Sequence, residues 1–359
     1  MSTSTITTTS RPTPVVAVDA NGADLGPAEV AAGAMLAAQR GARVLLFGPA
    51  KEMEVSSSKD VEVVDAPVSI AKSADPVRAA RSRPEASIVQ AARAVASGRA
   101  QALVCAGGTG AAVAAGLFNI KRGRGIHRPA LALPLPVPGR PVTLLDVGAN
   151  AEARKEHLVQ FAFMGAALAQ VVLGVKRPRV GLLSNGEEAE RGSALVVAAR
   201  AELQERVQTG GWLELVGNVE GGDVTAGVAD VIVTDGFTGN VALKLMEGVS
   251  QTVLGAVREA ASSSPRAKLG GLLLRPSLRG FREEIDPEAH GGAYLLGLRS
   301  LGVVPHGRFT RNGFAQAILR AQRGASEDLV GRTHLALEQA GALKLAPASV
   351  RASSLRQAL

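Results

Sequence analysis

Short, continuously apolar runs rich in Val, Ile and Leu alternate along this chain with longer stretches rich in Ala and Leu. Runs of four to six apolar residues are typical of strands that are buried on both faces, and the longer stretches have the length of helices. The alternation therefore predicts an α/β fold with a mostly parallel sheet covered by helices on both faces. Strands are expected at 15–19, 43–47, 61–64, 102–105, 129–133, 143–147, 179–183, 213–216, 231–234 and 303–305.

The longer stretches predict helices at 28–40, 86–97, 110–119, 153–173, 193–206, 238–262 and 312–322. One segment, from Ser262 to Pro287, interrupts the alternation and is rich in Ser, Arg and Leu. We expect a Ser/Thr-rich disordered tail at 1–12, a single catalytic domain at 13–346 with a protruding helical segment at about 250–290, and a C-terminal tail at 347–359.

Composition narrows the class of protein. Apolar residues make up 46% of the 359 positions, which is enough for a full core, and the 3% of aromatics means that small aliphatic side chains must fill it. The net charge of +8 favours anionic partners, and it leaves open nucleic acid, an anionic membrane, an acidic carrier protein and phosphate. Cys105 is the single cysteine, so no disulfide forms within the chain.

No membrane-spanning or secretory segment is predicted. The N-terminus lacks an apolar stretch after a basic start. The longest apolar run, 161–175, is about 15 residues, whereas a span needs roughly 20. The sequence predicts a cytoplasmic protein that has access to a membrane surface.

Glycine-containing polar turns follow five of the predicted strands, at 19–24, 106–110, 146–150, 184–188 and 234–240. In open parallel sheets, ligands bind beyond the carboxyl ends of the strands. We expect these turns to form one polar rim along one edge of the sheet. The phosphate-binding candidates on that rim are Gly107, Gly108, Thr109, Gly110, Asn185, Gly186, Asp235 and Gly236.

The loop from Gly107 to Gly110 lies between a predicted strand and a predicted helix. Its amides and the helix dipole favour an anion, and Thr109 adds a hydroxyl donor. The alternative is a tight turn in which glycine serves only the backbone geometry. The loop matches neither the dinucleotide fingerprint nor the P-loop, because the required third glycine and the Gly-Lys-Ser/Thr are absent.

Asn240 and Lys244 are four residues apart and share one face of the predicted helix. We expect Asn240 to lie in a first turn whose free amides point outward, and a capped helix with an exposed lysine is the alternative. His306 follows a strand and is a further candidate for the rim, although a lone histidine is more often structural. Cys105 ends an apolar strand and is expected to be buried and inert. Metal-ligand spacings are absent from the sequence.

Several segments resemble the PlsX family of phosphate acyltransferases, in the same order along the chain. They include VVAVDANGADLGP, LVCAGGTGAAVA, TLLDVGANAEARKEHLVQFAFMG, RPRVGLLSNGEEAERG, LVGNVEGGDVTAGVADVIVTDGFTGNVALKLMEG and IDPEAHGGAYLLGL, and the resemblance covers 15–321. It implies an open three-layer α/β/α fold like that of phosphotransacetylases and isocitrate/isopropylmalate dehydrogenases, in a homodimer.

The resemblance also implies a reaction. An acyl group passes from acyl carrier protein to inorganic phosphate, and the acyl phosphate feeds phosphatidic acid synthesis. The implied contacts to phosphate and acyl phosphate fall on Gly107–Gly110, Arg191 and Asn240, and position adds Lys244 and His306 as catalytic candidates. The resemblance implies no cofactor, no metal and no nucleic acid. It implies peripheral attachment to the inner face of the cell membrane, with a membrane glycerol-phosphate acyltransferase as a further partner.

Two alternatives to this function stay open. One is a phosphotransacetylase-like enzyme that uses acyl-CoA. The other is a non-catalytic, membrane-associated scaffold for lipid synthesis. The second follows from several rim positions that depart from the residues usual in the family, among them Gly108, Val304 and His290.

The segment 266–282 interleaves five cations with six large apolar residues. A basic amphipathic segment of this kind suits an anionic membrane surface. We expect two helical pieces separated by a break at Pro276, and a hairpin that contacts a second copy of the chain or caps the core is the alternative. The predicted membrane contacts are Lys268, Leu272, Leu274, Arg275 and Leu278.

Overall fold

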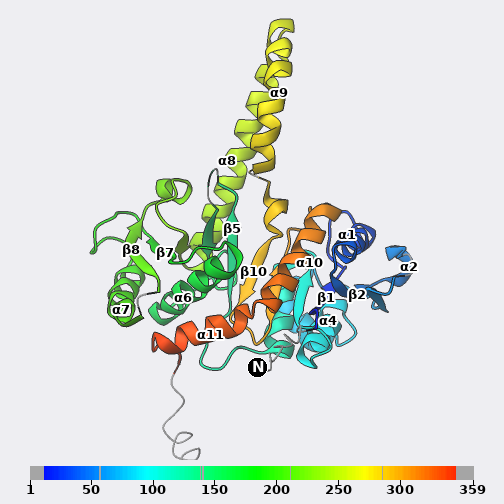
Figure 1. Ribbon diagram of the computed structural model, residues 1–359, viewed down its shortest axis with the longest axis horizontal. Helices are drawn as coiled ribbons and strands as arrows, with labels where there is room; N and C mark the ends of the chain where they lie inside the picture. Colours follow the sequence, from blue (N-terminus) through cyan, green and yellow to red (C-terminus); the bar gives the residue numbers. More distant parts are fainter. Residues whose placement is uncertain are drawn as a thin grey trace, which may run out of the picture.

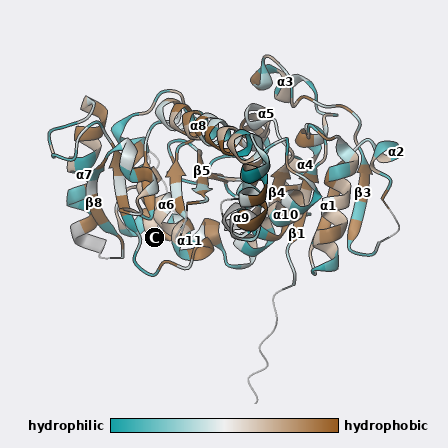
Figure 2. Cartoon of the chain, turned by 90° about the horizontal axis from the view of Figure 1, so that it is seen from above, coloured by the Kyte–Doolittle hydropathy of each residue, from teal (hydrophilic) through white to brown (hydrophobic). Residues whose placement is uncertain are grey.

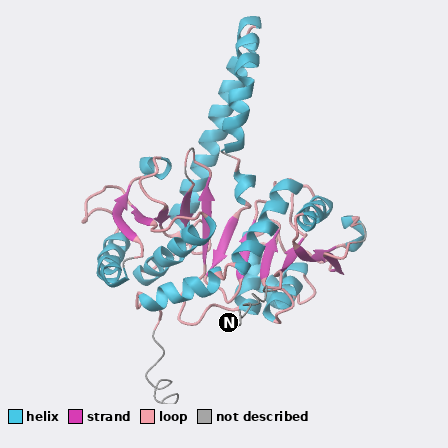
Figure 3. Ribbon diagram, in the orientation of Figure 1, coloured by secondary structure: helices cyan, strands magenta, loops and turns pink. Residues whose placement is uncertain are grey.

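The computed structural model describes residues 12–55, 58–137, 139, 141–210, 212–284 and 286–344. This part of the chain forms an 11-stranded sheet in the order β3-β2-β1-β4-β11-β10-β5-β6-β9-β7-β8, with helices on both faces (Figures 1 and 3). The strands are β1 (Val15–Asp19), β2 (Arg43–Gly48), β3 (Val61–Asp65), β4 (Ala102–Cys105), β5 (Ala130–Leu135), β6 (Val142–Leu145), β7 (Arg179–Leu183), β8 (Glu214–Val219), β9 (Val231–Val233), β10 (Ala293–Leu296) and β11 (Leu301–Val304).

The helices follow the strands in an alternating order. They are α1 (Pro27–Gln39), α2 (Ala50–Met53), α3 (Pro76–Ser82), α4 (Ser87–Ala96), α5 (Thr109–Ala115) with the π-helical turn η1 (Gly116–Ile120), α6 (Lys155–Val172), α7 (Ala194–Gly210), the 3₁₀ helix η2 (Gly221–Thr225), α8 (Gly236–Ser262), α9 (Pro265–Glu284), the 3₁₀ helix η3 (Pro287–His290), α10 (Arg311–Ser326) and α11 (Leu329–Gln339).

Alternate residues of each strand face opposite sides of the sheet, so two cores form. Val16 and Val18 of β1 pack in one core with α1, α6, α7, α10 and α11. Ala17, between them, packs in the other core with α3, α4, α5 and the first part of α8. The period of two along the strand thus produces three layers, and the expected α/β/α architecture is confirmed.

The sheet is mostly parallel but reverses direction at its centre. β10 pairs antiparallel with both β11 and β5, and β5 pairs antiparallel with β6. Three reversals leave β6, β9, β7 and β8 running opposite to β1, β2, β3, β4 and β11. The turns that follow β1 and β4 therefore lie at one edge, and those that follow β6, β7 and β9 lie at the other. The expectation of a single rim along one edge is wrong for this reason.

Several elements were not expected from the sequence, among them α2, α3, α11 and β10. β10 is absent from the expected strands, because its four residues lie between Gly292 and Gly297 and give too short an apolar run. The expected break at Pro276 is wrong, because α9 continues through this residue as a helix. The proline removes one amide from the helix, and the Leu- and Arg-rich flanks favour helix strongly enough to carry it past that point.

Helices α8 and α9 form an antiparallel pair that stands out from the sheet (Figure 1). Both helices expose large apolar side chains. On α8 these are Phe237, Val241, Leu245, Val249, Val253, Leu254 and Val257, and on α9 they are Leu269, Leu272, Leu273 and Leu274. Within the described residues, neither helix meets the length and hydropathy needed to cross a membrane.

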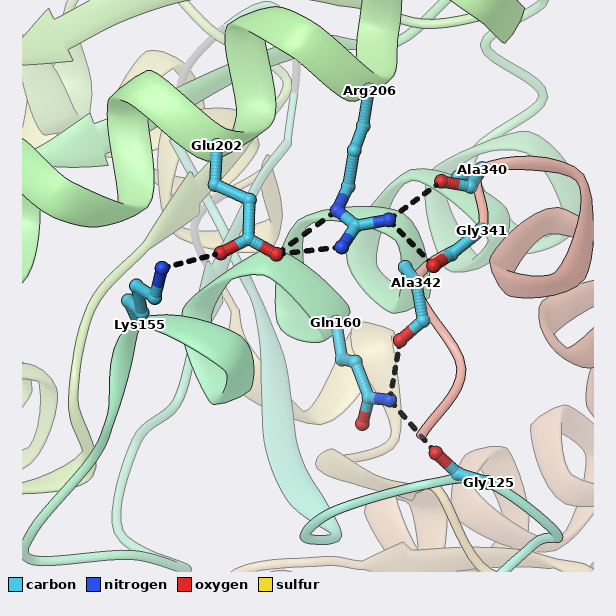
Figure 4. Close-up of polar contacts among 8 residues, drawn as sticks. All are labelled: Gly125, Lys155, Gln160, Glu202, Arg206, Ala340, Gly341 and Ala342. Atoms are coloured by element: carbon cyan, nitrogen blue, oxygen red, sulfur yellow. Dashed lines mark hydrogen bonds and ion pairs between the residues drawn. The ribbon is translucent and has the colours of Figure 1, made fainter. Parts of the chain in front are cut away.

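Side chains of α6 and α7 form hydrogen bonds that hold the end of the described chain in place (Figure 4). Arg206 donates to the carbonyls of Ala340 and Gly341, at 3.1 and 2.5 Å, and pairs with Glu202. Gln160 donates to the carbonyls of Gly125 and Ala342, at 2.9 and 2.8 Å. The loop at 121–128 and the segment after α11 are thus held together. The expected tails at 1–12 and 347–359 lie, except for Pro12, outside the described residues.

Candidate active site

A cavity of about 550 Å³ opens on the sheet face that carries α5 and the start of α8. Its floor includes Leu131 and Leu133 of the central strand β5, and its two sides come from opposite halves of the sheet. One side is the loop Gly107–Gly110, which follows β4, and the other is Val147–Gly148 with α8. The reversal of strand direction at β5 places these two strand ends on either side of a single hollow.

The glycine loop forms the first side of the cavity and keeps donors available. Gly107 and Gly108 adopt φ values of +80° and +62°, which L-residues with a side chain rarely adopt. A side chain at Gly107 would also meet the carbonyl oxygen of Gly22 at 2.8 Å. The loop is followed by α5, whose first backbone bond runs from Ala112 to Gly108. The amides of Thr109 and Gly110 have no acceptor among the described residues, so this turn offers N–H groups to an anion.

The start of α8 forms the second side, and its amides are already occupied. The amide of Gly236 donates to the carbonyl of Asn150 at 2.8 Å. Those of Phe237 and Thr238 donate to the Asp235 carboxylate, at 3.0 and 2.8 Å. Asp235 is therefore the N-cap of α8, and the expectation of free amides in this turn is wrong. Asp235 and Gly236 do not line the cavity.

Asn240 and Lys244 project from α8 into the cavity lining, one helical turn apart as expected. Asn240 lies beside Gly148, where a side chain on the glycine would come within 3.9 Å of the Asn240 amide. The Lys244 ammonium pairs with Glu247 at 3.0 Å, and both side chains line the cavity. α8 thus supplies an amide and a cation in place of backbone donors.

His306 also lines the cavity, in the turn after β11. Its Nδ1 accepts a hydrogen bond from the amide of Arg308 at 3.2 Å, and its ring stacks on Phe309. Burial lowers the pKa of His306, and the positive charges of Arg308 and Lys244 lower it further. A neutral ring whose Nδ1 accepts must carry its proton on Nε2, so Nε2–H is the donor that this histidine offers.

Three predicted residues lie away from this hollow. Asn185, Gly186 and Arg191 follow β7, and β9 separates that strand from β6, whose end borders the cavity. Arg191 pairs with Glu188 at 3.7 Å, and its side chain is 66% exposed. The turn after β7 is at the same sheet edge as that after β6 but two strands further out, so the structure does not bring these residues to the cavity.

Sequence reasoning missed other residues of the cavity wall. Asp24, Lys72 and Arg308 line it and received no role from the sequence. Asp24 is placed by a backbone bond from its amide to the carbonyl of Gly307, at 2.8 Å. Lys72 lies in an irregular segment between β3 and α3, where no sequence pattern distinguishes a site residue from a surface lysine.

Comparison with known proteins shows which family this chain is similar to. The family model described as "Fatty acid synthesis protein" matches residues 15–332. A phosphate acyltransferase of Geobacillus sp. (strain WCH70) is 41% identical over 329 residues, which covers 90% of this chain and 98% of that protein. A phosphate acyltransferase of Thermobifida fusca (strain YX) is 42% identical over 314 residues, covering 86% of this chain and 87% of that protein.

This chain belongs to the phosphate acyltransferase family. It is therefore an acyltransferase, as the resemblance predicts, and it acts in lipid synthesis. Two solved structures agree with its fold. A phosphotransacetylase from Streptococcus pyogenes matches with a TM-score of 0.58 at 16% identity and covers 86% of this chain and 93% of that chain. The EutD phosphotransacetylase of Staphylococcus aureus matches with a TM-score of 0.57 at 18% identity, covering 87% and 94%.

Cys105 is poorly suited to act as a nucleophile in this acyltransferase. It is buried at the end of β4, as expected, and its thiol donates to the carbonyl of Gly107 at 2.9 Å. Burial raises the pKa of the Cys105 thiol well above its ordinary value, and the neighbouring Asp19 carboxyl raises it further. A thiol that stays protonated does not attack a thioester.

Two buried carboxyl groups lie beneath the two sides of the cavity. Asp19 ends β1 and is contacted by the amide of Asn21 and the thiol of Cys105. Burial raises the pKa of Asp19 to about 7. Asp146, after β6, accepts from the amides of Leu131, Gly148, Ala149 and Asn150 and from the Asn150 side chain. Asp146 thereby shapes the turn that carries Val147 and Gly148. The described residues hold no cluster of His, Cys, Asp and Glu that would bind a metal.

Proposed function

We propose that this acyltransferase moves a fatty acyl group from acyl carrier protein to inorganic phosphate within the cavity described above. The observation that carries the proposal is the set of donors on its two sides. The free amides of Thr109 and Gly110 are on one side, and Asn240 and Lys244 are on the other. Neutral donors together with one cation suit a dianion that must also remain able to react.

In the proposed reaction, an oxygen of hydrogen phosphate attacks the thioester carbonyl. The new C–O bond forms as the C–S bond breaks, and the phosphate proton goes to the departing thiolate. The products are acyl phosphate and the free carrier thiol. Phosphate is the nucleophile and the thioester is already activated, so the protein contributes position and charge stabilisation instead of a covalent intermediate.

The cavity residues that offer donors each have a proposed role in that step. The glycine loop and Asn240 hold the phosphate, and Lys244 offsets its charge while remaining tethered to Glu247. His306 donates from Nε2 to the oxyanion that develops on the carbonyl, because its Nδ1 is already an acceptor. Contacts of Arg191, Asn185 and Gly186 with the substrate remain predictions from the sequence.

The deciding experiment is an assay of acyl phosphate formation by the purified protein, with phosphate and matched acyl carrier protein and acyl-CoA donors. Turnover with the carrier donor, at least tenfold better than with acyl-CoA, is the expected result. Preference for acyl-CoA would favour the phosphotransacetylase-like alternative. No acyl phosphate from any donor would leave the scaffold alternative.

We further infer that the chain forms a homodimer through α8. Phe237, Val241, Leu245, Val249, Val253 and Val257 recur every fourth residue and are 47% to 66% exposed. Neighbours in this row, such as Val249 and Val253, share one face of the helix, and such a face suits a second copy of the same helix, because a two-fold interface is self-complementary. Exposure of so many large apolar side chains in a monomer would favour aggregation.

Contact with an anionic membrane is proposed for the first half of α9. Leu269, Leu272, Leu273 and Leu274 are exposed, and Lys268 lies on the same short stretch, within ten residues of the start of the helix. The proposed contact would bring the enzyme to the inner face of the cell membrane, where a membrane glycerol-phosphate acyltransferase would receive acyl phosphate. The side chains of Arg275 and Leu278, also predicted to contact the membrane, lie outside the part that the structure describes.

Two pairs of substitutions test the proposed dimer contact of α8 and the proposed membrane contact of α9 separately. Val249→Ser with Val253→Ser is expected to give monomers in light scattering, because it interrupts the apolar row on α8. Leu272→Ser with Leu274→Ser is expected to abolish sedimentation with anionic vesicles at low salt while the dimer persists. Monomers from the α9 variant, or wild-type protein that ignores the vesicles, would contradict the membrane assignment.

A further inference from the structure

A second hollow, of about 750 Å³, opens beside the catalytic cavity. It shares the lining residues Gly22 and Lys72 with that cavity, so the two spaces adjoin. Its walls are the turn after β1, the segment 69–75 and α3, which lies next to α5 at the margin of the fold (Figure 2). A ligand too long for the catalytic cavity can extend into this hollow.

The outer wall of the hollow carries unpaired positive charge. Lys72, Arg78 and Arg83 line it, all three are exposed, and none forms an ion pair with a described carboxylate. The carboxylate of Asp75 caps α3 by accepting from the amide of Arg78 at 2.9 Å. Ala79 and Ala80 turn the other face of α3 into the core. α3 therefore presents cations to solvent around Val77, whose side chain is 50% exposed.

This wall is also fixed to the glycine loop. A side chain at Gly22 would meet Cβ of Ala71 at 2.7 Å, and one at Gly108 would meet it at 3.0 Å. A side chain at Gly110 would meet Pro76 at 3.0 Å. Three glycines thus allow the segment leading into α3 to pack directly on the turn that is proposed to bind phosphate. Anything bound to α3 would have a defined position relative to that turn.

We propose that the cationic face of α3 and the adjoining hollow are the docking surface for the acyl carrier protein. The inference rests on the function proposed above. A carrier protein is acidic and presents its thioester at the end of a flexible arm that is joined through a phosphodiester. Such a donor requires a cationic surface outside the cavity and a passage leading into it. Lys72, Arg78 and Arg83 supply the charge, and the hollow supplies the passage.

Electrostatic complementarity of this kind acts mainly on the rate of association and makes it sensitive to salt. Docking at α3 should therefore affect the carrier-linked donor and spare a donor without the carrier. Arg78 and Arg83 are suitable for a test, because they line the hollow but not the catalytic cavity.

The chain offers a matched control. A second basic groove is lined by Lys121, Arg122, Arg124, Arg299 and Lys344, and it shares no residue with the catalytic cavity. Substituting Arg124→Glu and Lys344→Glu makes the same change in net charge as Arg78→Glu and Arg83→Glu. The control variant thus separates local docking from the overall positive charge of the protein.

The experiment measures kcat/KM with acyl carrier protein donors and with acyl-pantetheine at low and moderate salt. For Arg78→Glu/Arg83→Glu we expect a 10- to 100-fold loss with the carrier donor, through KM, and a change of less than twofold with acyl-pantetheine. With the carrier donor, the ratio of wild-type kcat/KM to variant kcat/KM should fall as the salt concentration rises. A carrier variant with reversed acidic residues should restore the rate of the enzyme variant.

Other results would overturn the docking surface. Equal losses with both donors would show that α3 acts on the cavity itself, and melting temperatures of this variant and of Arg78→Ala/Arg83→Ala would identify a folding defect. A loss confined to Arg124→Glu/Lys344→Glu would place the carrier on the other groove. Failure of the wild-type enzyme with every donor would instead contradict the proposed function, so the two failures are distinguishable.

Discussion

The two sides of the proposed catalytic cavity look alike in sequence but differ in the hydrogen-bond donors that they offer a ligand. Each is an apolar strand, a glycine turn and a helix. At the start of α5 the amides of Thr109 and Gly110 have no acceptor within the part of the chain that the structure describes. At the start of α8 the corresponding amides are taken by Asp235 and by the carbonyl of Asn150. An aspartate at the N-cap accepts hydrogen bonds from the same amides that would otherwise bind an anion at the start of a helix.

The two buried carboxyl groups beneath the two sides also differ, in the number of backbone amides that donate to each. Asp146 collects four backbone amides and is built into its turn, whereas Asp19 has a single backbone donor. Burial raises the pKa of both groups, with a value of about 7 for Asp19. On the α8 side the backbone amides therefore donate to acceptors of the protein itself. On the α5 side the amides of Thr109 and Gly110 have no acceptor among the described residues and can donate to a ligand.

The largest expected effect is from Gly107→Ala. A side chain there requires a φ near +80° and would meet the carbonyl of Gly22 at 2.8 Å, so the loop must move. Loss of aligned donors at a developing charge costs about 2.7–4 kcal/mol, or a rate loss of about a hundred- to a thousandfold. Gly98→Ala has the same φ but open space around it, and it should retain most activity. Equal activities of the two variants would remove the loop from the mechanism.

Asn240→Ala tests the opposite side. We expect a fall in kcat/KM approaching that of the loop variant, because Asn240 replaces the amides that α8 lacks. Arg191→Ala, which the family resemblance also predicts to be impaired, should fall less, since its side chain is 66% exposed and lies outside the cavity. Steady-state kinetics with phosphate as the varied substrate would measure both. A greater loss from Arg191→Ala would show that the cavity described here is incomplete.

Asp19→Asn should change how stability depends on pH. The native pKa is about 7, against an ordinary value of 3.8, so between these values the folded protein holds a proton that the unfolded chain has lost. Stability therefore falls as pH rises from about 4 to about 7, by at most about 1.4 kcal/mol per pH unit. The variant, which cannot ionise, should show a flatter profile in urea unfolding. Asp146→Asn, in contrast, should be less stable at every pH because it loses acceptors.

The smallest expected effect is from Asp235→Ala. Loss of an N-cap costs about 1 kcal/mol of stability. Asp75→Ala, which removes the cap of α3, is the matched comparison. Both should lower the unfolding midpoint slightly, and Asp235→Ala should leave phosphate KM within about threefold of wild type. A large rise in phosphate KM for Asp235→Ala alone would assign this aspartate to the site after all.

Periodicity predicted most of the fold, because most strands are short apolar runs and most long helices are Ala- and Leu-rich stretches. β4 and β7 were predicted with their observed bounds. The direction of pairing was beyond reach, because the positions of strands do not say which neighbours pair antiparallel. β10 was missed, but it is antiparallel to both β11 and β5 and so leaves those two strands parallel to each other. The antiparallel pairing of β5 with β6 is what reverses β6, β9, β7 and β8 relative to the other half of the sheet. The error about a single rim follows from this antiparallel pair, whose two strands were both predicted but whose relative direction was not.

The candidate site was predictable where chemistry is local to the sequence. The glycine loop, Asn240, Lys244 and His306 were identified from their positions after strands, and the structure gathers them in one cavity. The cap formed by Asp235 is local and was given as an alternative from the sequence. The occupation of the Gly236 amide was not predictable, because the carbonyl of Asn150 that accepts from it is distant in sequence. Asp24 and Lys72 were missed for the same reason, since tertiary packing alone brings their loops to the cavity.

The position of β11 between β4 and β10 has a consequence for how the protein is made. β4 ends at Cys105, and the strand that covers its edge begins at Leu301, roughly 200 residues later. At 5–20 residues per second, a ribosome needs about 10–40 s to supply it. Throughout that interval the edge of β4 is an open template for pairing with other nascent chains. We expect the protein to depend on chaperones during synthesis and to refold slowly from denaturant, because its sheet closes last at its centre.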